Sequence, residues 1–269
     1  MNASLFDAHN HLQDERLAAN HTQIIAECRS VGVAGMVVNG TCQADWPKVL
    51  KLARQHDFIL PSFGYHPWYL DQRTPDWIDE LHRHLDAIPS AIGEIGLDRW
   101  MENHDPELQA EMFTTQLGIA AERNLPLSIH CLKAWGALIN LLESNPIPEC
   151  GFLIHSYGGS AEMIPRFARL GAYFSISGYF AHDRKAKQQE VFKQIPSERL
   201  LIETDAPDMA PPELMIKFPY SDPATNKPAN HPANLRSIYE FVASLLGESS
   251  EQLATRIAVN HKRFFLLGE

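Results

Sequence analysis

The chain has 269 residues, of which 45% are hydrophobic and 21% are charged, as is usual for a globular protein. Its 23 Lys and Arg against 33 Asp and Glu give a formal net charge of −10, which argues against a protein that coats long polyanions through a basic surface. The four cysteines form no Cys-x-x-Cys pair, and no apolar run approaches the ~18 residues of a membrane helix. We therefore expect a reduced, cytoplasmic protein.

Short apolar runs alternate with amphipathic stretches along the chain. The runs predict eight strands, at residues 5–10, 36–39, 58–65, 91–97, 125–130, 152–155, 172–177 and 200–203. The amphipathic stretches predict helices between the strands, at residues 17–31, 44–55, 77–85, 106–123, 134–143, 161–170 and 184–195. Strands that alternate with helices of this length indicate a parallel sheet.

The end of the chain differs from this pattern. Residues 206–232 hold seven of the 18 prolines, too many for a regular element, and so predict a long loop that is either functional or disordered. A helix is predicted from residue 235 to a stop at Gly247, and Ser249 with Gln252 forms a capping box for one more.

Eight strand–helix units favour a closed barrel. The predicted fold class is α/β, a single (β/α)8 TIM-type barrel with an extra C-terminal helix, in one domain over residues 1–269. A doubly wound open sheet is the alternative. That fold favours a glycine-rich turn after its first strand, whereas this chain has Asp-Ala-His-Asn-His there.

Imidazoles and carboxylates gather at the predicted strand ends, where barrel enzymes carry their catalytic residues. Alternation along the first strand places His9 and His11 on one side, where both can bind one ion. The whole set comprises His9, His11, Glu94, His130, His155 and Asp205. Six ligands are too many for one tetrahedral ion but suit two ions that share a bridging carboxylate.

Glu94 is the natural bridge because its strand is central in chain order. We assign His9, His11 and Asp205 to one ion and His130 and His155 to the other. Imidazole with carboxylate suits Zn, Mn, Fe, Co or Ni, and oxygen-rich positions also accept Mg. Taken singly, His130 and His155 could also be buried core histidines. Two roles stay open for Asp7: it either supports a ligating imidazole or simply packs in the barrel.

The ordered motifs resemble those of the TatD family of metal-dependent hydrolases, over nearly the whole chain. The blocks that carry the resemblance start with Asp7-Ala-His-Asn-His11 and Gly64-Tyr-His66-Pro67, followed by Gly93–Asp98, Leu125–His130, His155–Ser160, Glu203–Pro207 and Asn230–Leu235. The resemblance implies a TIM-type barrel, a binuclear metal centre and hydrolysis of phosphodiesters, typically as a DNase or exonuclease. It also places metal ligands at the six positions found above.

The resemblance gives two further residues open roles. His66 is expected as a catalytic residue that contacts phosphate or supports the site, with a structural role before Pro67 as the alternative. Glu203 either hydrogen-bonds a ligand or packs in the barrel. The chain departs from the family pattern at Arg99, where members often have an aromatic residue. It also departs at Leu132, where many members have an Arg; Lys133 follows. These departures concern positions expected to contact the substrate and leave the metal ligands unchanged.

We expect a metal-dependent hydrolase in which Asp205 orients the attacking water and takes its proton, with Glu94 bridging the ions. Trp100, Tyr157 and Phe180 follow strands and either stack on bases or pack in loops. The net charge predicts weak, end-directed action on DNA or short oligonucleotides. No membrane and no obligate protein partner are indicated. Two alternatives stay open: an amide, lactone or small-ester hydrolase with the same metal site, and a barrel that only binds.

Overall fold

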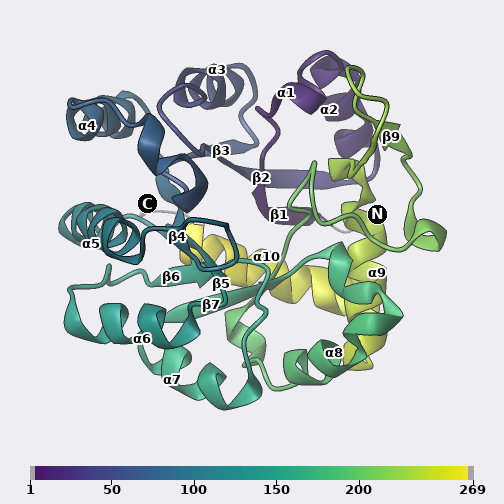
Figure 1. The fold of residues 1–269 in the computed structure, drawn as a ribbon. Coiled ribbons are helices and arrows are strands. Elements are labelled where there is room, and N and C mark those ends of the chain that lie inside the picture. The colour runs from purple at the N-terminus through teal and green to yellow at the C-terminus, as the bar shows by residue number, and fades with distance from the viewer. Residues whose placement is uncertain (1–3, 266–269) are drawn as a thin grey trace.

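The computed structural model describes residues 4–265, in which eight parallel strands form a nearly closed barrel (Figure 1). Each strand is hydrogen-bonded to the next in chain order. They are β1 (Leu5–Asn10), β2 (Val33–Asn39), β3 (Ile59–Phe63), β4 (Ala91–Asp98), β5 (Leu127–Leu132), β6 (Phe152–Ile154), β7 (Ala172–Ile176) and β8 (Leu200–Ile202). Past the end of β8, the N–H of Asp205 donates to the carbonyl of His9, 2.9 Å away. The predicted barrel is confirmed.

Most of the helices surround this barrel on its outside, and α10 lies across one of its ends (Figure 1). They are α1 (Glu15–Ala18), α2 (His21–Ser30), α3 (Trp46–Gln55), α4 (Trp77–Ala87), α5 (Pro106–Arg123), α6 (Trp135–Ser144), α7 (Ile164–Arg169), α8 (Ala186–Phe192), α9 (Leu235–Leu246) and α10 (Ser250–Phe265). The helix predicted over residues 17–31 is two helices, the first capped by Asp14. Between residues 4 and 265, no helix combines the length and the apolar composition needed to cross a membrane.

The proline-rich segment between β8 and α9 is an ordered loop. It contains a short hairpin of β9 (Tyr220–Ser221) and β10 (Pro228–Ala229). Two buried asparagines hold the segments on either side of this hairpin. Asn234 accepts the backbone N–H of Phe218 at 2.9 Å, and Asn230 donates to the carbonyl of Thr204 at 2.9 Å. The loop is thereby tied to the end of β8, where the predicted ligand Asp205 lies.

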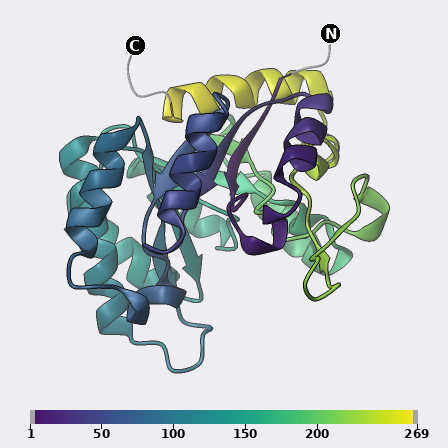
Figure 2. The same ribbon diagram turned by 90° about the horizontal axis from the view of Figure 1, so that it is seen from above.

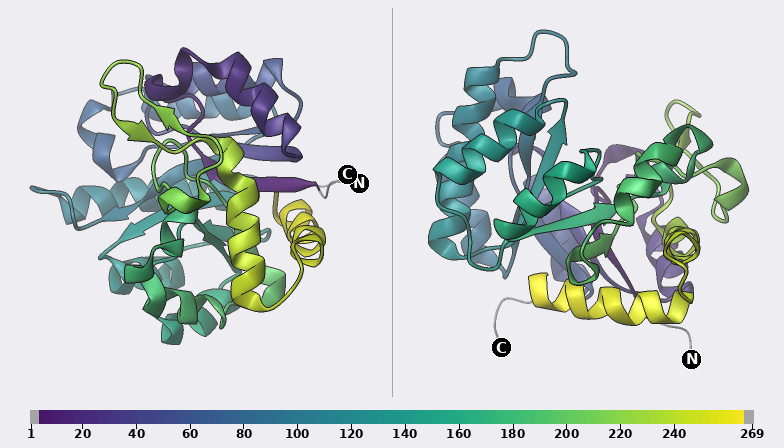
Figure 3. Two further views of the ribbon diagram at one scale, coloured as in Figure 1. Left: turned by 90° about the vertical axis from the view of Figure 1, so that its right-hand side faces the viewer. Right: turned by 90° about the horizontal axis from the view of Figure 1, so that it is seen from below.

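The extra C-terminal helix, α10, crosses the end of the barrel at which the strands begin (Figures 2 and 3). The Asn260 side chain donates to the carbonyl of Leu200, the first residue of β8, at 2.9 Å. The Phe264 ring stacks on Tyr173 of β7 with a centroid separation of 4.6 Å. Helix α10 therefore closes one end of the barrel with apolar and aromatic side chains and leaves the opposite end for the polar residues.

A buried histidine in this closing helix makes the stability depend on pH. His261 packs against the rings of Phe6 and Phe265, each with a centroid 4.7 Å away. Burial lowers the pKa of His261 from 6.5 to about 3. Below pH 6.5 the unfolded chain therefore takes up a proton that the folded chain does not, and stability falls until the pH reaches about 3.

Replacing His261 with Phe should remove this penalty. At about pH 4.5, the variant should gain about 2–3 kcal/mol of unfolding free energy relative to the original protein, beyond any difference at pH 7. Denaturant unfolding of both metal-free proteins at the two pH values measures the change. Parallel pH dependences for the two proteins would show that His261 is not the group responsible.

Candidate metal centre

The six predicted ligands lie together at the end of the barrel where the strands finish. His9 belongs to β1 and His11 follows it, Glu94 lies in β4, and His130 lies in β5. His155 comes directly after β6, and Asp205 comes three residues after β8. Because parallel strands all end at the same edge, residues far apart in the sequence converge here.

The two carboxylate oxygens of Glu94 face different groups of side chains. Its Oε2 lies 3.4 Å from Nε2 of His9 and 3.2 Å from Nε2 of His11. Both of these nitrogens also lie near Oδ1 of Asp205, at 3.7 and 3.5 Å. The atoms of His9, His11, Asp205 and Glu94 Oε2 thus form one cluster, called site 1 below.

The other oxygen of Glu94 faces the histidines of β5 and β6. Its Oε1 lies 3.1 Å from Nδ1 of His130 and 2.8 Å from Nε2 of His155. These two nitrogens are 3.3 Å apart. The atoms of His130, His155 and Glu94 Oε1 form a second cluster, called site 2.

The atom spacing in site 1 fits a tetrahedral ion. Ligand atoms about 2.1 Å from a common centre lie about 3.4 Å from one another at the corners of a tetrahedron. The five distances in site 1 that involve a histidine nitrogen run from 3.2 to 3.7 Å, including 3.3 Å between the Nε2 atoms of His9 and His11. Imidazole nitrogens with carboxylate oxygens are donors that first-row divalent metals prefer. These residues could therefore hold a metal ion.

Each histidine of site 1 is oriented by a hydrogen bond at its other ring nitrogen. Nδ1 of His9 lies 2.8 Å from Oγ of Ser128, and Nδ1 of His11 lies 2.8 Å from the carbonyl oxygen of Asn39. A ring held in this way presents Nε2 to the centre of the site. Such partners fix the tautomer of metal-binding histidines and strengthen them as ligands.

In site 2, a carboxylate lies near the other ring nitrogen of each histidine, at hydrogen-bond distance for His130 and further away for His155. Nε2 of His130 lies 3.1 Å from Oδ2 of Asp98, and Nδ1 of His155 lies 3.5 Å from Oε1 of Glu203. Glu203 also accepts hydrogen bonds from the hydroxyls of Ser156 and Ser175. We therefore infer that Glu203, whose role the sequence left open, orients His155.

The buried histidines set the charge of the central carboxylate. Burial alone would raise the pKa of Glu94, but His66, His155 and their neighbours outweigh it and hold this pKa well below its usual range. For Asp98, hydrogen bonds from His130 and Trp68 likewise outweigh burial and keep its pKa low. Both carboxylates are therefore ionised at neutral pH, the form in which a carboxylate can bind a metal ion.

His66 lies at the edge of site 2. Its Nδ1 accepts the backbone N–H of Trp68 at 3.2 Å, which leaves the ring proton of the neutral form on Nε2. That Nε2 lies 3.3 Å from Oε1 of Glu94. In this tautomer the ring is a hydrogen-bond donor aimed into the site rather than a metal ligand. Burial lowers the pKa of His66 to about 4, so it is neutral at neutral pH.

Asp7 accepts hydrogen bonds from backbone N–H groups and from the side chains of Thr204 and Asn10, and from no imidazole ring. Its Oδ1 accepts the N–H of Thr204 at 2.9 Å and the N–H of His9 at 3.3 Å. Its Oδ2 accepts the Thr204 hydroxyl at 2.6 Å. Asp7 thus joins β1 to the segment that carries Asp205, so the role of supporting a ligating ring is wrong for it.

The three aromatic residues considered for base stacking differ in exposure. Tyr157 is fully buried and Phe180 is 5% exposed, so stacking on a substrate is wrong for both, and ordinary packing is their role. Trp100 is 64% exposed. The sequence reasoning missed Trp68, which is 53% exposed and lies next to His66.

The sequence reasoning also gave no role to Asp98 and Ser128, although the alternation of side chains along a strand could have indicated both. Asp98 is four residues after Glu94 in β4, and Ser128 is two residues before His130 in β5, so each shares a side of its strand with a predicted ligand.

Replacing Asp98 with Asn should weaken metal binding at site 2. The charged partner of His130 is lost while the size of the side chain stays the same, and such losses typically cost about 10- to 100-fold in metal affinity. Metal titration of stripped protein measures the change. Glu102→Gln, in the exposed loop that follows, is the matched control and should bind normally. Unchanged affinity in Asp98→Asn would contradict the role given to this carboxylate.

Comparison with known proteins identifies the family. The sequence profile described as TatD related DNase matches residues 6–266. The chain therefore belongs to the TatD-related DNase family, as its motifs predict.

The relatives cover nearly the whole length of the chain. It is 31% identical over 267 residues to a Bacillus subtilis protein named as an uncharacterized metal-dependent hydrolase, YabD, covering 98% of this chain and all of that one. It is 32% identical over 265 residues to the Escherichia coli K12 protein named 3'-5' ssDNA/RNA exonuclease TatD, covering 97% and 98% of the two chains. The predicted class, a metal-dependent hydrolase, agrees with these names.

Solved structures give the same fold. The crystal structure of YjjV, a TatD homolog from Escherichia coli K12, superposes with a TM-score of 0.88 at 25% identity over the full length of both chains. A TatD family hydrolase from Entamoeba histolytica superposes with a TM-score of 0.85 at 22% identity, covering 98% and 99% of the two chains.

Proposed function

We propose that this protein is a divalent-metal-dependent exonuclease that removes nucleotides from the ends of single-stranded DNA or RNA. The observation that carries this proposal is the division of the site by Glu94, whose two oxygens face two separate groups of ligand atoms. Two ions about 3.5–4 Å apart that share a carboxylate are typical of enzymes that hydrolyse phosphodiesters. The names of the relatives support the same substrate class.

The ligands we propose are those given by the sequence. His9, His11 and Asp205 would hold one ion, His130 and His155 the other, and Glu94 both. The ligand chemistry admits Zn, Mn, Fe, Co, Ni or Mg. When bound, such ions supply positive charge that stabilises the phosphoryl oxygens in the transition state and eases deprotonation of the attacking water.

The protein's own residues would supply the positioning and the proton transfers. Asp205 directs Oδ1 toward His9 and His11, which leaves Oδ2 to orient the attacking water and accept its proton. His66, with its proton on Nε2, would donate a hydrogen bond to a phosphoryl or leaving-group oxygen at site 2. His66 would thus act as the catalytic residue expected from the sequence.

The net charge of −10 shapes the expected substrate range. Without a long basic groove, duplex DNA should bind weakly, so we propose action on strand ends and short oligonucleotides. Processive digestion of long duplex at physiological salt would contradict this. We keep the expectations of one domain, of a cytoplasmic location and of no obligate protein partner.

The function is tested with metal-stripped protein and a single-stranded oligonucleotide labelled at its 5′ end, with and without added Mg²⁺, Mn²⁺ or Zn²⁺. We expect a metal-dependent ladder of shortened labelled products, as digestion from the 3′ end gives. Release of labelled mononucleotide at once would instead indicate digestion from the 5′ end. Glu94→Ala protein, purified in parallel, controls for contaminating nucleases.

No cleavage with any metal, despite metals bound by elemental analysis, would contradict the nuclease assignment. Assays on amides, lactones and small esters would then test the alternative hydrolase. If the metal-loaded protein were inactive on all of these substrates, the remaining alternative would be a barrel that only binds a partner.

A further inference from the structure

Two of the five tryptophans are largely exposed, and each contacts a residue of the candidate metal centre through its side chain or its backbone. Trp68 is 53% exposed and lies in the short 3₁₀ helix Pro67–Gln72 that follows β3. Trp100 is 64% exposed and follows β4 by two residues. The centroid of the Trp68 ring lies 5.0 Å from that of His66 and 6.4 Å from that of His130. Its indole therefore borders site 2.

One carboxylate fixes both tryptophans relative to the metal centre. Oδ2 of Asp98 accepts the indole N–H of Trp68 at 2.7 Å, and the same oxygen lies 3.1 Å from Nε2 of His130. Oδ1 of Asp98 accepts the backbone N–H of Trp100 at 2.7 Å. The exposed side chain of Trp68 and the backbone of Trp100 are thus both held by the carboxylate that contacts His130.

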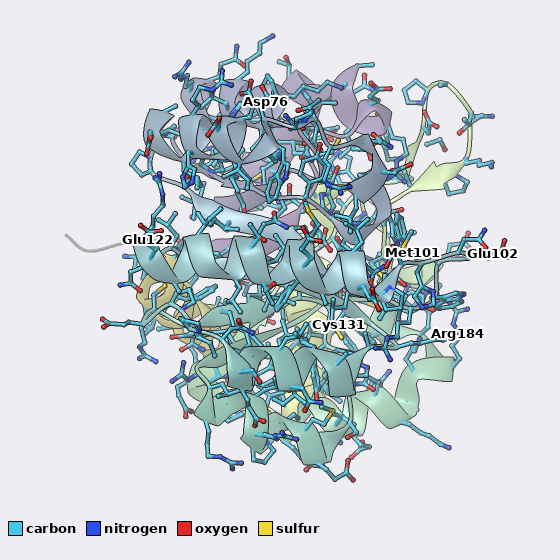
Figure 4. The ribbon with its side chains drawn as sticks, turned by 60° about the vertical axis from the view of Figure 1, so that its left-hand side comes forward. Asp76, Met101, Glu102, Glu122, Cys131 and Arg184 are labelled. Atoms are coloured by element: carbon cyan, nitrogen blue, oxygen red, sulfur yellow. The ribbon has the colours of Figure 1, made fainter. Side chains whose placement is uncertain are left out.

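Positive charge lies next to these aromatic rings. Nζ of Lys133, which follows β5, is 4.6 Å from the centroid of the Trp100 ring. Arg99 is also exposed, directly before Trp100. In Figure 4, the labels Met101 and Glu102 mark the loop that follows β4, and Arg184 lies on the same side of the molecule. Glu122, near the far end of α5, lies on the opposite side. An aromatic face beside a cation suits a nucleotide, which offers a base to stack and a phosphate to pair.

We propose that Trp68 and Trp100 form a stacking site for two unpaired bases at the end of a nucleic acid strand. Trp68 stacks on the base next to the phosphodiester at Glu94, and Trp100 stacks on the base of the neighbouring nucleotide. Lys133 pairs with the phosphate between them. The inference rests on the proposed nuclease function. It also explains how the protein would select single strands, because the faces of bases inside a duplex are covered by neighbouring bases.

The test compares an ordinary single-stranded oligonucleotide with one whose last two nucleotides are abasic at the end that the protein digests. Trp68→Leu should raise KM on the ordinary strand by about 5- to 100-fold, because stacking is worth that much per base, and should leave kcat nearly unchanged. On the abasic strand, Trp68→Leu and the original protein should be equal. Trp100→Leu should behave in the same way.

Two controls separate stacking from a structural effect. Trp68→Phe keeps an aromatic face but loses the indole N–H to Asp98, and it should retain most of the preference for the ordinary strand. Val259→Ala removes an exposed apolar side chain from α10, at the other end of the barrel, and should change nothing.

A Trp68→Leu protein that loses kcat equally on both strands would overturn the proposal in favour of a purely structural role through Asp98. Unchanged kinetics on the ordinary strand would overturn it as well. In both cases the nuclease function stands, because the original protein cleaves. Absence of cleavage by the original protein is a different result, and it would overturn both proposals.

Discussion

Replacing Glu94 with Gln is expected to abolish nuclease activity, with a fall in kcat of more than about 10³-fold. One oxygen and the negative charge are lost from a carboxylate whose two oxygens lie next to His11 and His155. Losing one well-placed stabilising group in an active site already costs about 10²–10³-fold, and here the binding of both ions is weakened together. Activity on the labelled oligonucleotide and metal content by elemental analysis measure the effect.

The control for this substitution is thermal unfolding of the metal-free proteins. Glu94 is buried among histidines, so its loss could also disturb folding. Glu94→Gln protein that is folded, binds less metal and is inactive would support the bridging role. Folded variant protein with two ions bound and full activity would contradict it.

Replacing Asp205 with Asn should lower kcat by about 10²–10⁴-fold, the usual contribution of a general base. The amide oxygen can still face His9 and His11, so most of the metal should stay bound. Asp205 is also held in a left-handed backbone conformation, with φ of 51°, that Asn tolerates as well as Asp does. The loss should therefore come from chemistry rather than from local unfolding. Single-turnover cleavage with saturating metal measures it.

Asp208→Asn is the matched control for Asp205→Asn. Asp208 lies three residues further along the same loop, is largely exposed and pairs with Arg16. Its replacement should leave kcat unchanged. Equal losses in the two variants would assign the effect to the charge of the loop and not to proton transfer.

The sequence predicts the barrel well because the capping residues and apolar runs along the chain agree with the helices and strands that pack in the structure. Helix α5 is predicted with the bounds that the structure has, since Pro106 begins it after a capping Asp105, and Asn124 ends it in the left-handed conformation. Strand β5 is shifted by two residues at each end, from 125–130 to Leu127–Leu132. An apolar run shows that a strand exists, but its ends depend on pairing with β4, where Gly96 lies opposite His130.

That the six proposed ligands lie together is predictable for a similar reason, because each lies in or just after a parallel strand. Roles that depend on loops are not. His66 and Trp68 follow β3 in a turn whose direction is set by hydrogen bonds, including the one between Trp68 and Asp98. Burial also depends on the whole fold: Tyr157 and Trp100 both follow strands, yet one is fully buried and the other largely exposed.

The central claim, that one carboxylate divides the site between two ions, is tested most directly by anomalous diffraction from crystals loaded with Mn²⁺. We predict two anomalous peaks, about 3.5–4 Å apart, one on the Oε2 side of Glu94 near His9 and His11 and one on the Oε1 side near His130 and His155. A single peak at saturating Mn²⁺, or two peaks of which neither contacts Glu94, would contradict the account.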